Sequence, residues 1–324
     1  MHVLVVGGAG YIGSHCTRDL IDHGHTTVVF DNLSTGHREA VSSEFVQGDI
    51  RDRAALRALF SEHKFDAVMH FAAKSLVGES VSNPLRYYDV NVGGTVALLS
   101  EMQNSGVMNL IFSSTCAVYG APEYLPLDEQ HPKAPVSPYG LSKLMVEQIL
   151  DAAREREGFN IAALRYFNAA GAHPDGSLGE SHNPETHLIP IALEANMGQR
   201  GPLKLFGDDY ETRDGTCIRD YVHIMDLAAA HRLAMEHLCA GKSSGGAWNL
   251  GTGTGTTVLE ILQSIHRVTG EPVPYEKAER REGDPPGLYA KAIKAEHELG
   301  WTPEYTEVDE IVKHAWQWAK KPLF

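Results

Sequence analysis

The sequence has few cysteines and no long apolar run. Only four of its 324 residues are cysteine, and no two of them form a Cys-x-x-Cys pair. This usage argues against a disulfide framework and is typical of a reducing compartment. No apolar run reaches membrane-spanning length, and the amino terminus leads directly into a predicted strand without a signal peptide. We therefore expect a cytoplasmic protein with no membrane partner.

Basic residues are also scarce relative to acidic ones. The chain has 28 Lys and Arg against 42 Asp and Glu, which gives a formal net charge of −14. A nucleic-acid partner is not expected, because binding to phosphate backbones requires a basic surface. The 17 histidines include no His-Glu-x-x-His motif and no Cys/His cluster with zinc spacing. We therefore expect no metal site.

A glycine-rich turn connects the first predicted strand to the first predicted helix. The apolar run at 3–6 is followed by Gly-Gly-Ala-Gly-Tyr-Ile-Gly at 7–13, and a helical pattern continues to about residue 23. In this context such a turn holds a dinucleotide pyrophosphate at the positive end of the helix. The next predicted strand, 26–30, ends at Asp31, whose carboxylate can accept hydrogen bonds from a ribose and repels a 2′-phosphate. NAD rather than NADP is therefore the expected cofactor.

Predicted strands and helices alternate through the first half of the chain. The strands fall at 44–47, 66–70, 109–112 and 160–164, and the helices at 53–62, 84–105 and 138–157. This alternation predicts an α/β fold with a doubly wound parallel sheet of the Rossmann-like kind. A loop rich in Gly, Pro, His and Asp follows at 171–187, and further helices are predicted near 188–197, 225–238, 257–269 and 307–319.

The change from regular strand–helix alternation to the loop at 171–187 predicts two domains. We expect an NAD-binding Rossmann-like domain at 1–170 and a smaller mixed α/β substrate-binding domain at 171–324. Some segments of the second half, such as 247–250, are expected to return to the main sheet.

Tyr139 and Lys143 lie four residues apart on the predicted helix 138–157, so their side chains share one face. A free tyrosine has a pKa of about 10, and a nearby ammonium favours the phenolate. Lowering this pKa to about 7 requires roughly 4 kcal/mol, which a lysine and a cationic nicotinamide can supply together. Taken alone, such a pair is usually a surface tyrosine beside a solvated lysine. Its importance here depends on the glycine turn and on Ser-Ser-Thr at 113–115, after a predicted strand.

The order of these signals resembles the extended short-chain dehydrogenase/reductase superfamily, and in particular its nucleotide-sugar 4-epimerases. The segments that carry the resemblance are Gly-Tyr-Ile-Gly-Ser-His at 10–15, Asp-Asn-Leu-Ser at 31–34, His-Phe-Ala-Ala at 70–73, Val-Gly-Glu-Ser at 77–80, Ser-Pro-Tyr-Gly at 137–140, Arg-Tyr-Phe-Asn-Ala-Ala-Gly-Ala at 165–172, Arg-Asp-Tyr-Val-His at 219–223 and Arg-Arg-Glu-Gly-Asp at 280–284. The resemblance implies reversible C4 epimerisation of UDP-glucose and UDP-galactose through a transient 4-keto intermediate, with tightly bound NAD. It also implies a homodimer formed through the helices at 84–105 and 138–157.

The resemblance further implies a role for individual residues. Tyr139 would be the base, Lys143 its pKa-lowering partner and Thr115 the third catalytic residue. The implied cofactor-binding residues are Gly7, Gly10, Tyr11, Ile12, Gly13, Asp31, Asn32, Leu33, Ser34, Asp49, Ile50, Phe71, Ala72, Ala73, Asn91, Tyr139, Lys143 and Phe167. The implied UDP-sugar residues are Thr115, Tyr139, Asn168, Leu188, Phe206, Arg219, Arg281, Asp284 and Leu288.

Several alternatives remain open at this point. Either Arg219 or Arg281 can clamp a diphosphate with its forked donors, but singly each is more often a surface ion-pair partner. Leu288 stands where tyrosine excludes N-acetyl sugars in the resembled group and smaller residues admit them, so a 4-epimerase of UDP-N-acetylglucosamine or of a UDP-pentose is an alternative. A 4,6-dehydratase would carry Asp-Glu where this chain has Cys116 and Ala117. A non-catalytic NAD-sensing protein would typically lack the tyrosine or the lysine.

Overall fold

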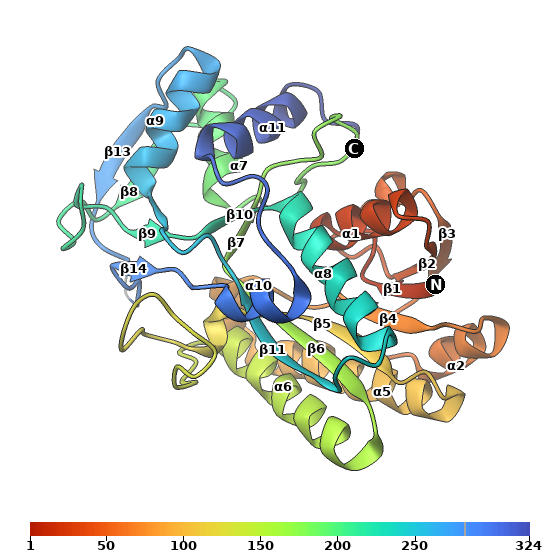
Figure 1. The fold of residues 1–324 in the computed structure, drawn as a ribbon. Helices are drawn as coiled ribbons and strands as arrows, with labels where there is room; N and C mark the ends of the chain where they lie inside the picture. The colour runs from red at the N-terminus through yellow and green to blue at the C-terminus, as the bar shows by residue number, and fades with distance from the viewer. Residues whose placement is uncertain (282) are drawn as a thin grey trace.

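The computed structural model describes residues 1–281 and 283–324. Residue 282, part of the 280–284 segment quoted above, lies outside the described residues. Figure 1 shows a central parallel sheet with helices on both faces, and a smaller group of helices and short strands beyond one end of its strands. Among the described residues, every helix is too short or too polar to cross a bilayer.

The main sheet has seven strands in the order β11-β6-β5-β4-β1-β2-β3, and neighbouring strands are parallel throughout. The strands are β1 (His2–Val6), β2 (Thr26–Asp31), β3 (Glu44–Gln47), β4 (Ala67–His70), β5 (Asn109–Thr115), β6 (Asn160–Tyr166) and β11 (Gly245–Leu250). The predicted doubly wound parallel sheet is confirmed. The expected return of residues 247–250 to this sheet is confirmed as well, because β11 pairs with β6 along its whole length.

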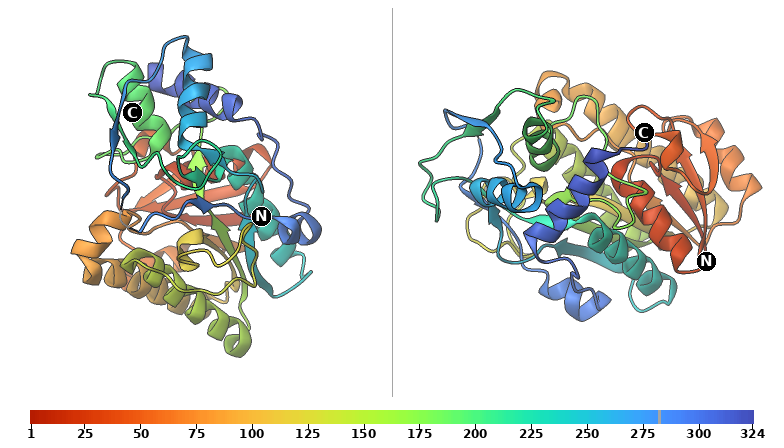
Figure 2. Two further views of the ribbon diagram at one scale, coloured as in Figure 1. Left: turned by 90° about the vertical axis from the view of Figure 1, so that its left-hand side faces the viewer. Right: turned by 90° about the horizontal axis from the view of Figure 1, so that it is seen from above.

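Both faces of the sheet are buried, as expected when strand side chains alternate between two covered faces. Val3 and Val5 share a core with α1 (Tyr11–Asp22) and α8 (Ile224–Cys239). Leu4 and Val6 share the opposite core with α2 (Arg53–Glu62), α5 (Gly94–Ser105) and α6 (Pro138–Glu157). A helix of the second half, α8, therefore covers one face of the main sheet (Figures 1 and 2).

Helices with strong capping signals begin where the sequence predicts. The Ser137 hydroxyl accepts a hydrogen bond from the Gly140 amide at the start of α6, and Asp52 caps α2 in the same way. The predicted helix 84–105 is observed as α4 (Pro84–Tyr87), a wider π-helical stretch (Tyr88–Gly93) and α5. Two short helices were not predicted, α3 (Val77–Ser82) and α10 (Ile293–Leu299), and neither has a side-chain cap.

The smaller unit has a core of its own, formed by α7 (Leu188–Asn196), α9 (Val258–Thr269) and α11 (Val308–Lys320). Its short strands are β7 (Asn168–Ala170), β8 (Leu203–Phe206), β9 (Ile218–Arg219), β10 (Tyr221–His223), β12 (Thr256–Thr257), β13 (Tyr275–Ala278) and β14 (Gly287–Leu288). Because α8 and β11 belong to the main sheet's layers, the chain crosses between the two units more than once. The domain division near residue 170 stays a prediction.

Candidate active site

A cleft of about 190 Å³ lies at the carboxyl ends of β1, β2, β3 and β4. Ligands of doubly wound sheets bind at this edge. Predicted cofactor-binding residues that line the cleft are Gly7, Gly10, Asp31, Asn32, Ser34, Asp49, Ile50, Phe71, Ala72 and Ala73. Lining residues that the sequence analysis did not assign to the cofactor include Thr35 and three cations, Arg51, Lys74 and Arg86. Arg51 forms an ion pair with Asp49 and Arg86 forms one with Glu79.

The glycine turn owes its composition to two different constraints. A Cβ on Gly7 would lie 2.4 Å from the Ala72 amide nitrogen, and one on Gly13 would lie 2.3 Å from the Gly7 carbonyl oxygen. Both glycines are therefore required by the protein's own packing. A Cβ on Gly10 would meet nothing nearer than 3.5 Å, yet Gly10 lines the cleft and precedes α1 without a side-chain cap. This exposed backbone at a helix amino terminus fits the close approach of a pyrophosphate.

Asp31 is held rigidly at the end of β2. One carboxylate oxygen accepts a hydrogen bond from the Ala9 amide (3.0 Å) and the other from the Leu33 amide (2.8 Å). Burial raises the pKa of Asp31, while these backbone bonds act to lower it. Each oxygen keeps a second lone pair for another donor, so the carboxylate can still accept from ribose hydroxyls at the cleft.

Two of the predicted cofactor-binding residues are engaged with the protein itself. The Asn91 amide accepts from the Lys74 backbone nitrogen (2.8 Å) and donates to the Lys74 carbonyl (3.0 Å) and to the Ser142 hydroxyl (2.9 Å). It thereby fixes the loop after β4 to α6, behind the cleft. Tyr11 donates its hydroxyl to the Gly171 carbonyl (2.7 Å), which links the glycine turn to the loop before α7.

The three predicted catalytic residues come together at the carboxyl end of β5. Thr115 ends this strand, and its hydroxyl oxygen accepts from the Ala117 amide (3.2 Å), so its proton remains free to be donated. Tyr139 and Lys143 lie in the first two turns of α6. The Lys143 ammonium donates to the Ser113 carbonyl (2.7 Å) and lies 4.7 Å from the centre of the Phe112 ring.

The electrostatics of this pair differ from the sequence expectation. Burial raises the pKa of Tyr139 to about 12, and the Thr115 side chain counteracts only part of this shift. Burial lowers the pKa of Lys143 to about 7, against the opposing effect of Glu147. The protein alone therefore favours a neutral phenol, because desolvation outweighs any attraction between phenolate and ammonium. Bound NAD supplies a hydride acceptor and an additional positive charge in such a site.

A buried ion pair beneath the catalytic residues was missed by the sequence analysis. Glu147 and Arg165 are 3% and 2% exposed, and they form two hydrogen bonds of 2.8 and 2.6 Å. Glu147 also accepts from the Ser114 hydroxyl (2.6 Å), and Arg165 donates to the Tyr119 hydroxyl (2.8 Å). The only sequence signal for this ion pair was the four-residue spacing that places Glu147 one helical turn after Lys143.

The predicted UDP-sugar residues form two groups on the smaller unit. The Arg219 guanidinium donates to the Pro285 carbonyl (3.0 Å) and lies 3.4 Å from an Asp284 carboxylate oxygen. Leu288 pairs with Arg219 where β14 joins β9. In the second group, the Arg281 guanidinium stacks 4.4 Å above the Phe206 ring.

The remaining residues connect these groups to the catalytic end of the sheet. Phe167 and Leu288 pack against the same apolar cluster as Cys116, the residue after Thr115. Asn168 lies on β7 and donates its amide to the Asp220 carbonyl (3.3 Å), and Leu188 begins α7. Phe167 and Leu288, which are distant in the sequence, thus meet at the apolar cluster that contains Cys116, the residue after Thr115.

Comparisons with known proteins agree over almost the entire chain. The family model described as "NAD dependent epimerase/dehydratase family" matches residues 3–251. A UDP-glucose 4-epimerase of Halalkalibacterium halodurans is 50% identical, with 99% of this chain and 96% of the relative covered. One of Rhizobium leguminosarum bv. trifolii is 52% identical, with 98% and 97% covered. The crystal structure of UDP-glucose 4-epimerase from Brucella ovis in complex with NAD matches with a TM-score of 0.95 at 51% identity, covering 97% of both chains.

The buried ion pair yields a prediction about stability. We expect Glu147→Gln to lower the free energy of unfolding by about 3–5 kcal/mol, because it leaves the Arg165 guanidinium charged and unpaired in the interior. Asp151→Asn, which removes the partner of Arg154 in an exposed pair, should change it by about 0.5 kcal/mol or less. Denaturant unfolding of both variants measures the difference.

The same substitution should also change the pH profile of activity. The negative charge of Glu147 raises the pKa of Lys143, so its loss should lower that pKa and move the alkaline limb of the kcat/KM profile to lower pH. An unshifted limb in a folded Glu147→Gln protein would contradict the assignment of this influence to Glu147.

Proposed function

The chain belongs to the NAD dependent epimerase/dehydratase family, and we propose that it interconverts UDP-glucose and UDP-galactose at C4 with tightly bound NAD. The observation that carries this proposal is the convergence of Thr115, Tyr139 and Lys143 at the sheet edge that also holds the NAD cleft. The relatives named UDP-glucose 4-epimerase support the choice of reaction and of sugar.

In this reaction Tyr139 accepts the proton of the sugar 4-hydroxyl and later returns it to the 4-keto oxygen. Lys143 stabilises the phenolate, and Thr115 donates a hydrogen bond to the reacting oxygen. Bound NAD would accept the hydride from C4 and return it, so no cofactor would be consumed overall. The two halves of the reaction present opposite faces of the sugar ring, so the sugar must turn while the nucleotide remains bound.

The residues on the smaller unit are suited to hold the nucleotide during this turn. Arg219 and Arg281 bring forked donors that match a diphosphate, and Phe206 presents an aromatic face for uracil. In the structure the Arg219 guanidinium contacts the Asp284 carboxylate and the Pro285 carbonyl, and the Arg281 guanidinium stacks on the Phe206 ring. UDP binding therefore requires the two guanidinium groups to exchange or share these partners.

Dehydration is disfavoured by the residues after Thr115. Removal of water from the sugar needs an acid and a base at these positions. Burial raises the pKa of the Cys116 thiol to about 12, and Ala117 has no titratable group. The NAD-sensing alternative is disfavoured because the tyrosine and the lysine are both present, at the carboxyl end of β5.

A homodimer is part of the proposal. Two exposed apolar side chains lie on the first of the two segments predicted to pair between subunits: Leu85 of α4 is 79% exposed and Val96 of α5 is 37% exposed. Val81 of the adjoining α3 is 65% exposed. Side chains of this kind usually mark an interface when they gather on one face. The expected cytoplasmic location stays a prediction.

The dimer can be tested by mass. Light scattering at micromolar protein should give twice the mass of one 35.4 kDa chain. Leu85→Glu should shift the mass toward that of one chain, because it places a charge in an apolar interface. Ile293→Glu, at an exposed apolar residue of α10, is the matched control and should leave the dimer intact. A single-chain mass for the unmodified protein would refute the proposal.

The catalytic role of Tyr139 predicts that Tyr139→Phe lowers kcat by about 10²–10⁴-fold, the usual contribution of a general acid–base. NAD content and UDP affinity should be retained, because the change removes one oxygen only. A coupled assay with UDP-galactose measures turnover, and absorbance after denaturation measures bound cofactor. Near-normal turnover in this variant, or stoichiometric release of NADH by the unmodified enzyme, would sink the mechanism.

We expect the sugar range to depend on Leu288, which packs against the apolar cluster that contains Cys116. Leucine leaves part of the volume that an N-acetyl group needs, so weak activity on UDP-N-acetylgalactosamine is expected beside strong activity on UDP-galactose. Leu288→Tyr should lower the N-acetyl activity by about 10–200-fold and spare UDP-galactose. If the ratio of the two activities does not change, Leu288 does not gate the pocket.

A further inference from the structure

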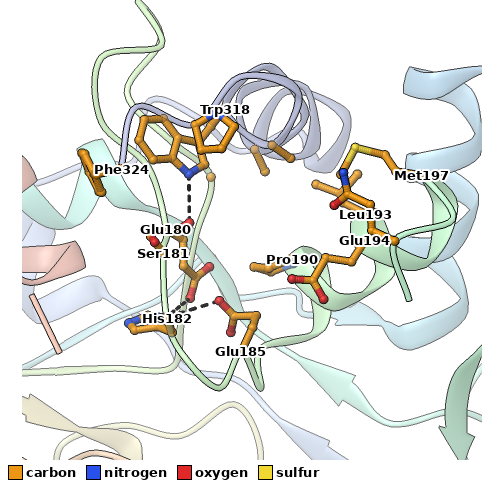
Figure 3. A pocket seen from close by; sticks show the side chains of 15 residues that line it. Glu180, Ser181, His182, Glu185, Pro190, Leu193, Glu194, Met197, Trp318 and Phe324 are labelled. Carbon is orange, nitrogen blue, oxygen red and sulfur yellow. Dashed lines mark hydrogen bonds and ion pairs between the residues drawn. The ribbon is translucent and has the colours of Figure 1, made fainter. Parts of the chain in front are cut away.

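The loop before α7 carries four metal-ligating side chains within eight residues: Glu180, His182, Glu185 and His187. One ligand atom from each lies within 4.8 Å of every other. The cluster stands apart from the cofactor cleft. Three of its members line a separate hollow of about 200 Å³, together with Trp318 and Phe324 from the end of the chain (Figure 3).

Four distances between these side chains lie between 2.7 and 3.4 Å, a range shared by hydrogen-bonded ion pairs and by ligands around one small ion. His187 Nδ1 lies 2.7 Å from Glu180 Oε1 and 3.1 Å from Glu185 Oε1. His182 Nδ1 lies 3.3 Å from Glu180 Oε1 and 3.4 Å from Glu185 Oε2. Tetrahedral zinc sites with bonds of about 2.0–2.1 Å separate neighbouring ligand atoms by roughly 3.3 Å. Most of the observed separations already lie close to this value.

Hydrogen bonding accounts for only part of the arrangement, in which His187 Nδ1 pairs with Glu185 Oε1 at 3.1 Å. Glu185 Oε1 already accepts from the backbone amides of Thr186 (2.7 Å) and His187 (2.8 Å). His182 Nδ1 is buried and has no hydrogen-bond partner, although two carboxylates lie beside it. Buried polar atoms without partners are uncommon in folded proteins. A cation at the centre of the cluster would satisfy this nitrogen and both carboxylates.

The negative charge of the cluster can be balanced in two ways. The side chains of Glu180 and Glu185 are only 6% and 7% exposed, so their two negative charges need a compensating charge of +2. One solution is a pair of imidazolium ions, with ring centres 5.2 Å apart. Although burial opposes it, contact with the two carboxylates raises the pKa of His187 to about 10. The other solution is a divalent cation with two neutral imidazoles.

We propose that Glu180, His182, Glu185 and His187 form a binding site for one divalent transition-metal ion of the zinc class. Two imidazole nitrogens and two carboxylate oxygens suit such an ion, whereas magnesium and calcium prefer oxygen ligands alone. Four protein ligands characterise a structural site rather than a catalytic one. The Glu-x-His-x-x-Glu-x-His spacing matches neither zinc pattern considered in the sequence, which is why the sequence analysis predicts no metal site.

The site's position indicates what the ion would do. Trp318 of α11 donates its indole nitrogen to the Glu180 carbonyl (2.9 Å), and Tyr11 contacts the Gly171 carbonyl at the start of the same loop. His187 immediately precedes α7. A bound ion would therefore tie this loop to the amino terminus of α7 and hold it against the first turn of α1.

The test uses the untagged enzyme with NAD bound, stripped of metal by a chelator and dialysed. Titration with Co²⁺ at neutral pH should saturate at one ion per chain and give the visible absorption bands of tetrahedral cobalt. Zn²⁺ should displace the cobalt and raise Tm, while Mg²⁺ should do neither. Failure of the unmodified enzyme to take up Co²⁺ or Zn²⁺ with saturation would overturn the proposal and leave the cluster as an ion-pair network only.

Substitution of single proposed ligands tests where the ion binds. His182→Gln removes one ligand and should weaken Co²⁺ binding by at least 100-fold. His173→Gln is the matched control, because His173 lies in the same loop but pairs with Asp175 outside the cluster. Glu185→Gln serves as a second ligand variant if His182→Gln does not fold. Cobalt binding of unchanged affinity in a folded ligand variant would refute this location. The measurement is independent of epimerase activity, so its failure would not count against the proposed reaction.

Discussion

The buried ion pair between Glu147 and Arg165 holds the catalytic helix in place. Glu147 belongs to α6, Arg165 to β6, and the same carboxylate accepts from Ser114 of β5. Arg165 extends the network to Tyr119, whose hydroxyl donates to Asn249 of β11 (2.6 Å). Buried charges are tolerated only when paired, so α6 cannot slide along the sheet without exposing one of them to an apolar surrounding. The position of Lys143, one turn earlier, follows from this anchor.

The anchored helix places its two catalytic groups in an environment that disfavours charge. Burial raises the pKa of Tyr139 and lowers that of Lys143, so the neutral forms of both are favoured together. A phenolate beside an ammonium is then a high-energy state of the protein alone. The positive charge of a bound oxidised nicotinamide would offset the desolvation of the phenolate, and reduction of the ring would remove that charge. The base strength of Tyr139 would then follow the redox state of the cofactor, which suits a reaction in which the proton and the hydride leave the sugar together.

The features that could be predicted from the sequence are those determined by residues close together in the chain. The helices at 53–62 and 138–157 have caps and the observed bounds, and the glycine turn, Asp31 and Tyr139/Lys143 depend on short spacings. The π-helical stretch at 88–93 was not predicted, because it reflects how Asn91 bonds to the Lys74 loop and to α6. The ion pair of Glu147 with Arg165 joins two elements through tertiary packing. No local sequence pattern indicates such a contact. None indicates that burial, rather than Lys143, determines the direction in which the pKa of Tyr139 shifts.

The buried carboxylate of Glu147 and the paired carboxylates of Glu180 and Glu185 are neutralised in chemically different ways. Glu147 faces a guanidinium, which does not lose its proton in proteins, so this pair is permanent and its geometry fixed. Glu180 and Glu185 face imidazoles, which can become neutral and then offer a lone pair in place of a proton. The first arrangement can only be an anchor. In the proposed metal site, the second could exchange two protons for one divalent ion without changing its net charge, so the order of the loop before α7 would depend on metal.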